Sequence, residues 1–278
     1  MSEPAIAIVA GGGALPWEAA DALAARREVM VIALDGEVEA IPQGVPYPVH
    51  TFGFHQVGAA RKAMLAADCR DLLLLGAVRK RPDFARILGD WETMKLLPRI
   101  VKAVVGGDDT ILRNLMSLIE EEGFRVVSVA QAVPELLAAP GQFSRTPPAV
   151  HHQDDIALGT RFLDAAAPFD IGQAVAVAEG RIVAVEAAEG TDAMLERVAA
   201  VRAAKRMRAK TGAGCLVKRA KRGQDMRADV PVVGTETLKR VVAAGLGGIA
   251  VEAGRTIIAG RREMIAAADD AGVFVVAV

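Results

Sequence analysis

Residues 5–16 read AIAIVAGGGALP, an apolar run that passes directly into three glycines and then into a helical pattern. That pattern places apolar side chains at Leu15, Ala19, Ala22 and Leu23, which fall on one face of a helix. A strand, a glycine loop and a helix in this order are typical of the first unit of a parallel sheet with crossover helices. The stretch therefore predicts an α/β fold that begins with a buried parallel strand.

The same alternation of strands and helices continues through the first half of the chain. Further apolar runs predict strands at 29–34, 72–75 and 126–129, and amphipathic patterns predict helices at 57–67 and 111–122. Gly123 follows the last of these helices and fits a helix stop. We predict that residues 1–133 form a Rossmann-like nucleotide-binding domain with a parallel sheet.

Prolines and glycine interrupt the pattern between Pro134 and Pro148. We predict a linker or hinge at 134–150 and a second α/β domain, the C-terminal catalytic domain, at 151–278. The predicted elements of the second domain are helix 156–166, a hairpin of 174–178 and 182–185, helix 193–206, strand 214–217, helix 235–244, strands 248–251 and 256–258, helix 262–271 and strand 273–276.

Composition limits the classes of protein that fit. The 278 residues are 52% hydrophobic but only 4% aromatic, which predicts an aliphatic core, and the net charge of -1 provides no global field that would select nucleic acid. Cys69 and Cys215 lie far apart and are expected to be buried free thiols in a reducing compartment. The N-terminus lacks a secretory pattern, and no apolar run is long enough to cross a bilayer. We expect a cytoplasmic protein.

The glycine loop is the first candidate binding site. The main chain of Gly11, Gly12, Gly13 and Leu15 could approach a phosphate or a nucleotide because no Cβ atoms obstruct the glycines. The motif is not the full dinucleotide fingerprint, since Pro16 stands where the last glycine would be. A tight turn without a ligand remains an equal alternative. No Walker-type Gly-Lys-Ser/Thr occurs, which argues against an ATPase.

Two further loops carry charges at predicted strand or helix ends. Arg79 and Arg81 follow the strand at 72–75 and could clamp phosphate oxygens, although a solvated basic turn is equally compatible. Asp108, Asp109 and Thr110 precede the helix predicted at 111–122. The acids could cap that helix, which is the commoner use, or hold a magnesium ion or a sugar hydroxyl.

A dense group of charges lies at residues 218–231, which read KRAKRGQDMRADVP. Cations before and between acids suit a polyphosphate that is gripped by basic groups while acid oxygens hold a metal or water. Asp225 is the leading candidate for an indispensable residue, Lys218, Arg227 and Asp229 are further catalytic candidates, and Gln224 is a candidate substrate contact. A solvated connection is the alternative. The runs 212–217 and 230–233 are predicted to be neighbouring buried strands, which favours a site at their ends.

Acids and amides near the predicted hairpin form a second group. Thr191 or Asp192 could cap a helix, whereas Glu189 and Asp192 could provide oxygen ligands for magnesium. Gly190 and Thr191, which lie between these acids, are candidate substrate contacts. Gln173 could contribute an amide contact or serve as a turn residue. None of the four histidines has a convincing metal spacing, so all are expected to be surface or packing residues: His50, His55, His151 and His152.

Six of these motifs occur in an order that resembles a known family. They are residues 10–16, 76–82, 106–110, 170–173, 185–195 and 218–234. This ordered set is similar to that of the UDP-2,3-diacylglucosamine pyrophosphatases of the LpxI family, which act in lipid A biosynthesis. The resemblance covers nearly the whole chain. One departure is Lys221-Arg222, where the family often has Lys-Pro.

The resemblance implies magnesium-dependent hydrolysis of UDP-2,3-diacylglucosamine to UMP and 2,3-diacylglucosamine 1-phosphate, or lipid X. It also implies a two-domain protein that encloses its substrate and contacts the cytoplasmic face of the inner membrane transiently. The expected roles are charge neutralisation by magnesium and four cations, and metal binding or water orientation by four acids: Lys218, Arg227, Arg79 and Arg81, and Asp225, Asp229, Glu189 and Asp192.

Two other readings stay open. The glycine loop, with Asp35 after the second strand, suggests an NAD(P)-dependent oxidoreductase. A protein that senses UDP-sugars without turnover is the non-enzymatic alternative. The sequence gives no indication of the oligomeric state.

Overall fold

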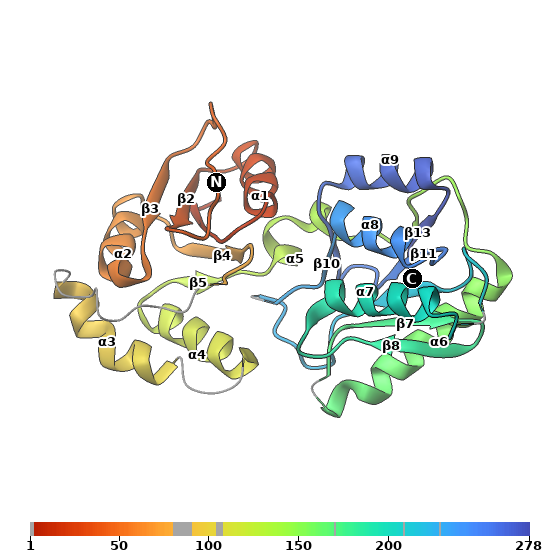
Figure 1. Cartoon of the computed structure of the whole chain (residues 1–278). Helices are drawn as coiled ribbons and strands as arrows, with labels where there is room; N and C mark the ends of the chain where they lie inside the picture. Colours follow the sequence, from red (N-terminus) through yellow and green to blue (C-terminus); the bar gives the residue numbers. More distant parts are fainter. Residues whose placement is uncertain (1–2, 80–90, 104–107, 170, 208, 228) are drawn as a thin grey trace. The chain divides into compact units, whose positions relative to one another are not determined.

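A computed structural model describes residues 3–79, 91–103, 108–169, 171–207, 209–227 and 229–278, except for the side chains of residues 91, 92 and 108–110. The chain forms two compact units (Figure 1). Unit 1 comprises Met1–Val133 together with the short segment Asp225–Asp229, and unit 2 comprises Pro134–Gln224 and Val230–Val278.

Unit 1 is built on a five-stranded parallel sheet with the strand order β3-β2-β1-β4-β5. The apolar runs of β1, β2 and β4 are buried almost throughout, as expected for parallel strands that are covered on both faces. The strand order reverses between β1 and β4, so the carboxyl ends of these two strands are where ligands bind in open α/β sheets. Its described elements are β1 (Ile6–Ala10), α1 (Leu15–Ala24), β2 (Val29–Leu34), β3 (Val49–Phe52), the 3-10 turn η1 (Phe54–Gln56), α2 (Val57–Ala66), β4 (Asp71–Leu75), α3 (Trp91–Ala103), α4 (Asp108–Glu121), β5 (Arg125–Val126) and α5 (Val129–Ala132).

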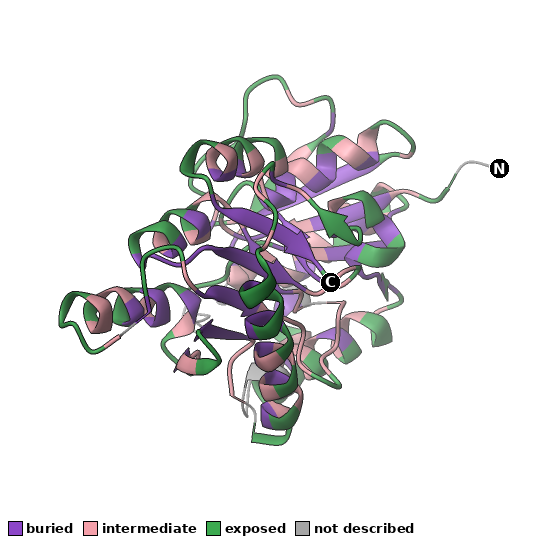
Figure 2. Ribbon diagram, turned by 90° about the vertical axis from the view of Figure 1, so that its right-hand side faces the viewer, coloured by how far each residue is buried: buried purple, intermediate pink, exposed green. Residues whose placement is uncertain are grey.

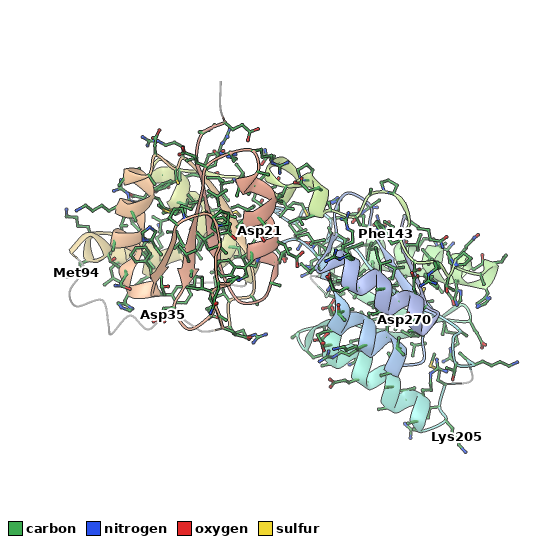
Figure 3. All side chains as sticks on the ribbon, turned by 90° about the horizontal axis from the view of Figure 1, so that it is seen from above. Asp21, Asp35, Met94, Phe143, Lys205 and Asp270 are labelled. Atoms are coloured by element: carbon green, nitrogen blue, oxygen red, sulfur yellow. The ribbon has the colours of Figure 1, made fainter. Side chains whose placement is uncertain are left out.

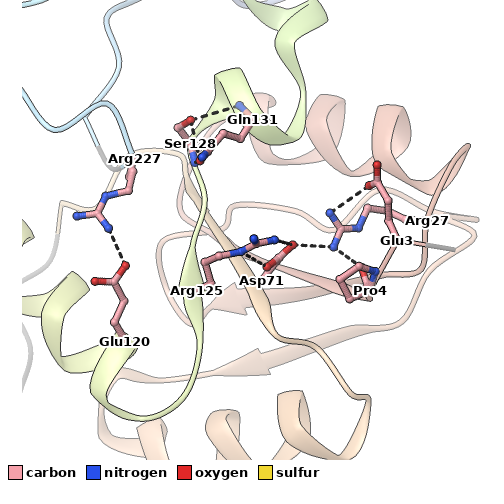
Figure 4. Close-up of polar contacts among 9 residues, drawn as sticks. All are labelled: Glu3, Pro4, Arg27, Asp71, Glu120, Arg125, Ser128, Gln131 and Arg227. Carbon is pink, nitrogen blue, oxygen red and sulfur yellow. Dashed lines mark hydrogen bonds and ion pairs between the residues drawn. The ribbon is translucent and has the colours of Figure 1, made fainter. Parts of the chain in front are cut away.

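The strand predicted at 126–129 is only partly correct. Val126 pairs with β4, but Val129 already opens helix α5. The cause is a capping box, in which the Ser128 hydroxyl accepts a hydrogen bond from Gln131 N at 3.3 Å and Gln131 Oε1 accepts one from Ser128 N at 2.9 Å (Figure 4). This local cap outweighs the strand preference of the apolar run.

Unit 2 contains a six-stranded mixed sheet with the order β6-β13-β11-β9-β7-β8. Strands β9, β11 and β13 run parallel, whereas β7 is antiparallel to both β9 and β8. Its described elements are the 3-10 turn η3 (Pro134–Leu136), β6 (Gly141–Gln142), α6 (Val150–Ala166), the 3-10 turn η4 (Ala167–Phe169), β7 (Ala174–Ala178), β8 (Arg181–Val185), α7 (Gly190–Ala203), β9 (Cys215–Lys218), β10 (Val232–Val233), α8 (Thr235–Ala243), β11 (Gly248–Val251), β12 (Ile257–Ile258), α9 (Arg261–Ala271) and β13 (Phe274–Ala277).

Helices cover both faces of this sheet. Successive residues of each strand point to opposite faces, so neighbouring residues pack against different helices. Leu216 and Ile249 pack with residues of α7, α8 and α9, whereas Val217 and Ala250 pack with Ile156 and other residues of α6. Figure 2 shows the central strands as buried and the outer helix surfaces as exposed, whereas β6 is exposed. The predicted mixed α/β architecture, with a parallel sheet in the first half and a second α/β region, is confirmed.

One predicted pairing in unit 2 is wrong. The runs 212–217 and 230–233 are not neighbouring strands, because β9 lies between β11 and β7 while β10 pairs with β12 in a separate two-stranded sheet. Hydrophobicity indicates that a segment is a buried strand but does not specify its partner. In the described part of the chain, every helix is too short or too polar to span a membrane.

Candidate functional site

The glycine loop of unit 1 is held by main-chain hydrogen bonds. Gly11 N donates to Leu75 O at 2.8 Å, and Gly12 N donates to Ala77 O at 2.8 Å. A Cβ atom on Gly11 would lie 2.5 Å from Ala77 O, and one on Gly12 would lie 2.9 Å from Glu37 O. Gly11 therefore allows the ends of β1 and β4 to approach closely, and Gly12 lies against the main chain that follows β2. The amides of both glycines are already used in hydrogen bonds.

Gly13 and Leu15 differ from the first two glycines. Gly13 is exposed, has a φ of 96° and has nothing within 4 Å of a Cβ position, so its main chain is open to a ligand. Leu15 opens α1 and its side chain is buried. Any contact from Leu15 to a ligand would come from its main chain. Asp35, the acid behind the oxidoreductase interpretation, is exposed after β2 (Figure 3).

The structure describes the charged loops of unit 1 only in part. Arg79 N donates to Glu37 Oε2 at 2.9 Å, and the arginine is exposed after β4. Arg81 lies outside the described residues. Helix α4 begins at Asp108, earlier than predicted, and the side chains of Asp108, Asp109 and Thr110 also lie outside the description.

Within unit 1, Asp225 is held by Arg227, which lies two positions further along the chain. Arg227 Nη2 donates to Asp225 Oδ2 at 2.7 Å, and Arg227 Nε donates to Asp225 Oδ1 at 3.0 Å. The Arg227 main-chain amide also donates to Oδ1, at 3.1 Å. The remaining end of the guanidinium, Nη1, lies 2.6 Å from Glu120 Oε1 on α4 (Figure 4). Arg227 therefore joins the segment Asp225–Asp229 to the helix.

These hydrogen bonds determine what the Asp225 carboxylate can do. The bond from the Arg227 side chain, aided by the main-chain amide and by the charge of Arg113, lowers the pKa of Asp225 although partial burial opposes the shift. A carboxylate with a lowered pKa is a poor general base at neutral pH but a good metal ligand or water-orienting group. Its side chain is 27% exposed, so solvent or substrate can reach it.

Two neighbours of Asp225 take part in local turns. Asp229 N donates to Asp225 O at 3.2 Å, which closes the short segment. Gln224 Oε1 accepts a hydrogen bond from Lys221 N at 2.8 Å and closes the preceding turn. The side-chain oxygen of Gln224, predicted to contact substrate, is therefore used within the loop.

In unit 2, several predicted residues meet at the edge of the six-stranded sheet that is formed by the carboxyl ends of β8, β9 and β11. Lys218 ends β9, and its Nζ donates to Thr191 Oγ1 at 2.9 Å. The Thr191 hydroxyl donates to Glu186 Oε1 at 2.8 Å, and Gln173 N donates to Glu186 Oε2 at 2.9 Å. The structure thus brings Lys218, Thr191 and Gln173 together around Glu186, a residue that sequence reasoning did not select.

A second polar group occupies the same edge. Glu252, directly after β11, accepts hydrogen bonds from Arg219 Nη2 at 3.1 Å and from Ala220 N at 3.0 Å. Asp164 on α6 contacts Arg219 at 3.4 Å and Arg222 at 3.2 Å. Sequence reasoning also missed Glu252 and Asp164. The usable sequence signal was that Glu186 and Glu252 each directly follow a predicted strand, where ligand-binding residues of α/β sheets tend to lie.

The acids predicted to bind metal have basic partners. Glu189 Oε1 lies 2.8 Å from Arg197 Nη2, and Asp192 Oδ2 lies 3.5 Å from Arg240 Nη2. In the parts of the chain that the structure describes, no three or more His, Cys, Asp or Glu side chains are grouped to hold a metal ion. Magnesium binding stays a prediction.

Helix α7 does not use the predicted side-chain caps. Its N-cap is Glu189, which makes no side-chain capping bond, so Thr191 and Asp192 lie inside the first turn. Gly190 opens the helix with a φ of 82°. The hydroxyl of Thr191 is directed instead to Glu186.

The structure confirms packing roles for one histidine and for both cysteines. His152 is buried on α6, where Nδ1 accepts a hydrogen bond from Ala149 N and Nε2 lies 2.9 Å from Gly212 O. Burial lowers its pKa despite the bond to Gly212. Cys69 and Cys215 are free and buried, and burial raises the pKa of Cys69 to about 11. Neither thiol has the properties of a nucleophile.

Comparison with known proteins gives consistent matches over both halves of the chain. The family profile described as the LpxI N-terminal domain matches residues 5–136, and that of the LpxI C-terminal domain matches residues 139–276. A curated protein of Caulobacter vibrioides, named UDP-2,3-diacylglucosamine pyrophosphatase LpxI, is 39% identical over 274 residues. That alignment covers 98% of this chain and 97% of the relative.

Proposed function

The chain belongs to the LpxI family, and from this premise we propose that it hydrolyses the pyrophosphate bond of UDP-2,3-diacylglucosamine. The products are UMP and 2,3-diacylglucosamine 1-phosphate, and the step belongs to lipid A biosynthesis. The proposal is supported by an alignment over nearly the full length of the chain, at 39% identity, to a relative whose name states this activity. The observation that carries it at the level of residues is the ionised Asp225 held by Arg227.

The proposed chemistry is attack of water on a phosphorus atom, with charge developing on the leaving phosphate. Asp225 orients the water or a metal ion rather than acting as a strong base, because its pKa is lowered. Lys218 and Arg227 neutralise the phosphate oxygens, and Arg79 adds a further exposed cation. Thr191 and Gln173 border Lys218 and contribute polar contacts to the substrate.

Magnesium is the cofactor that we propose. Asp225 fits this role, because it is ionised, partly exposed and offers hard oxygen atoms, and magnesium sites commonly combine one or two carboxylates with substrate phosphates. Bound magnesium would polarise the phosphate oxygens. Glu189 and Asp192 are the other proposed ligands, and each of them, like Asp225, also pairs with an arginine.

The substrate carries two acyl chains and resides in a membrane. We therefore propose that the protein works in the cytoplasm and contacts the inner membrane face transiently. The open main chain at Gly13, beside the start of α1, is a suitable position for part of the nucleotide.

The decisive experiment is an assay of purified protein with radiolabelled UDP-2,3-diacylglucosamine in oxygen-18 water. We expect UMP and 2,3-diacylglucosamine 1-phosphate in the presence of magnesium and none after chelation with EDTA. The product that carries oxygen-18 identifies the phosphorus that water attacks. An intact substrate under all conditions would refute the hydrolase proposal, and turnover unaffected by EDTA would refute only the magnesium requirement.

A further inference from the structure

We propose that Glu186 is a positioning residue, which orients the hydroxyl of Thr191 and thereby fixes the ammonium group of Lys218 toward the substrate phosphates. The proposal rests on the function proposed above, in which Lys218 neutralises phosphate charge. Its structural basis is a continuous series of hydrogen bonds inside unit 2, from Glu186 to Thr191 to Lys218.

Glu186 is held at both its main chain and its side chain. Its amide donates to Ala174 O at 2.9 Å, and its carbonyl accepts from Gly172 N at 2.9 Å, which extends the β7–β8 pairing by one step. Its two carboxylate oxygens accept hydrogen bonds from Gln173 N and from the Thr191 hydroxyl. The carboxylate is therefore fixed before any ligand arrives.

Gly172 shows how closely the glutamate is enclosed. A Cβ atom at Gly172 would lie 2.4 Å from Glu186 Cγ and 2.6 Å from Glu186 Cβ. Only a residue without a side chain leaves room for this position of Glu186. The glycine therefore belongs to the same arrangement, although it makes no contact with substrate in the proposed scheme.

The hydroxyl of Thr191 connects Glu186 to Lys218, because it can donate one hydrogen bond and accept others through its two lone pairs. The proton is donated to Glu186 Oε1, so the lone pairs of the oxygen are directed to Lys218 Nζ, 2.9 Å away. Thr191 is buried, with 8% of its surface exposed, so water does not readily replace either partner. Without the carboxylate, the hydroxyl would lose the acceptor that sets its direction.

The contact with Thr191 restrains Lys218, whose long, flexible side chain would otherwise leave its ammonium group mobile. Its stem is half-buried at the end of β9, and Thr191 accepts one of its three ammonium protons. Fixing this group in advance reduces the ordering needed when a phosphate binds. Glu186 thus acts through Thr191 and Lys218 and need not touch the reacting atoms.

Kinetics of paired variants test the proposal. We expect Glu186→Gln and Thr191→Val each to lower kcat/KM about 10- to 100-fold, the range for losing a hydrogen bond to a charged group. Thr191→Ser keeps the hydroxyl and should stay within about threefold of the wild type. Glu196→Gln, an exposed position on the same helix α7, is the matched control and should equal the wild type.

A double-mutant cycle separates positioning from mere structural support. If Glu186 acts through Lys218, Glu186→Gln should change kcat/KM by less than about twofold when Lys218 is already alanine. A full additional loss in that background would overturn the proposal. So would equal losses for Thr191→Ser and Thr191→Val, and this pair remains informative if Glu186→Gln does not fold.

A readout that needs no turnover separates this proposal from the proposed function. The ¹⁵N-ammonium signal of Lys218, assigned with Lys218→Arg, should be resolved in the wild type and in Thr191→Ser. The same signal should be broadened by exchange in Glu186→Gln. If the wild type does not hydrolyse the substrate but the signals behave as expected, the function is wrong and the positioning is right. An unchanged ammonium signal in folded Glu186→Gln would refute the positioning.

Discussion

The charge of Asp225 is governed by a single arginine two positions further along the chain. Arg227 contacts both carboxylate oxygens and reaches Glu120 with its other end. This arrangement keeps Asp225 ionised and fixes its direction, which a flexible loop alone would not do. Two predictions follow from these contacts, one for the acid and one for the base.

Replacing Asp225 by asparagine should lower kcat by about 100-fold or more, because the charged oxygens that orient water or metal are lost. KM should change little, since the cations and the glycine loop remain. Steady-state hydrolysis of UDP-2,3-diacylglucosamine measures both constants. Asp270→Asn changes an exposed acid on α9 and provides the control (Figure 3). Wild-type kcat in Asp225→Asn would remove this residue from the mechanism.

Replacing Arg227 by methionine should shift the pH dependence of the remaining activity. Arg227 lowers the pKa of Asp225 in the folded protein, so we expect the acid limb of the wild-type profile below the ordinary aspartate value of about 3.9. Without Arg227, the limb should move upward toward that value, and activity should be lost at a higher pH. The profile of kcat/KM between pH 3 and 7 tests this, provided that folding is followed in parallel. A limb at the same pH in both proteins would contradict the assignment.

The β7–β8 hairpin depends on a buried acid of helix α6. Asp155 accepts hydrogen bonds from Glu179 N at 3.1 Å and from Gly180 N at 2.7 Å, the two residues of the turn. Glu179 has a φ of 51°, which is unfavourable for a residue with a side chain. The buried acid therefore accepts hydrogen bonds from both amides of an exposed turn and stabilises its strained conformation.

Asp155→Ala should reduce the free energy of unfolding by about 1–3 kcal/mol, because two turn amides lose the hydrogen bonds to their buried, charged acceptor. Urea unfolding followed by circular dichroism measures the change. The adjacent Asp154→Ala is exposed on the same helix and should stay within about 0.5 kcal/mol of the wild type. Equal effects of the two substitutions would show that the turn contact contributes nothing.

At the start of β4, Asp71 lies between Arg125 and Arg27 (Figure 4). Burial tends to raise the pKa of Asp71, but the hydrogen bonds from the two arginines outweigh it and lower the pKa. Because the folded-state pKa is below the unfolded value of about 3.9, the stabilisation is present above that pH. It is lost as the pH falls through the lower, folded-state value.

Asp71→Asn should therefore destabilise the protein by about 2–4 kcal/mol at pH 7, since the buried side chain of Arg27 loses the closer of its two carboxylate partners, Asp71 and Glu3. The difference from the wild type should shrink below about pH 4 as the wild-type carboxyl becomes protonated. Denaturant unfolding at a series of pH values tests both parts. A difference that does not depend on pH would show that packing, not charge, accounts for the effect.

Strands were easier to predict than their partners. The bounds of β2, β7 and β11 agree with the prediction, because uninterrupted apolar runs ended by charged or glycine residues mark buried strands clearly. Strand β3 and helix α3 were not predicted. In β3 two of four residues are exposed, so no apolar run marks this edge strand. The partner of β10 was predicted wrongly, because strand pairing depends on segments that are distant in the sequence.

The candidate site was predictable only where its residues form one continuous motif. Lys218, Asp225 and Arg227 stand out in the sequence as a charged run, whereas Glu186 and Glu252 are single acids after unrelated strands. Only the order of strands in the sheet brings those two acids to the same edge as Lys218. Which residues come together at this edge therefore depends on the order of the strands as much as on the local sequence.

Substrate should stabilise the whole protein. With Asp225→Asn to prevent turnover, UDP-2,3-diacylglucosamine at 100 times its Kd should add about 2.7 kcal/mol to the free energy of unfolding, because it binds only the folded state. UMP at the same concentration should add less, since it offers fewer contacts. Thermal unfolding monitored by fluorescence measures both. No change in Tm with saturating substrate would indicate that the folded protein does not bind it.

The short segment Asp225–Asp229 is counted with unit 1, although the residues before and after it belong to unit 2. A gene cut after Val133 would therefore produce a first fragment without Asp225 and with Glu120 deprived of Arg227. Exchanging halves between relatives at that junction would combine an α4 from one parent with a Gly-Gln-Asp loop from another. Chimaeras need matched residues at 120 and 227, so these two positions should be inherited as a pair.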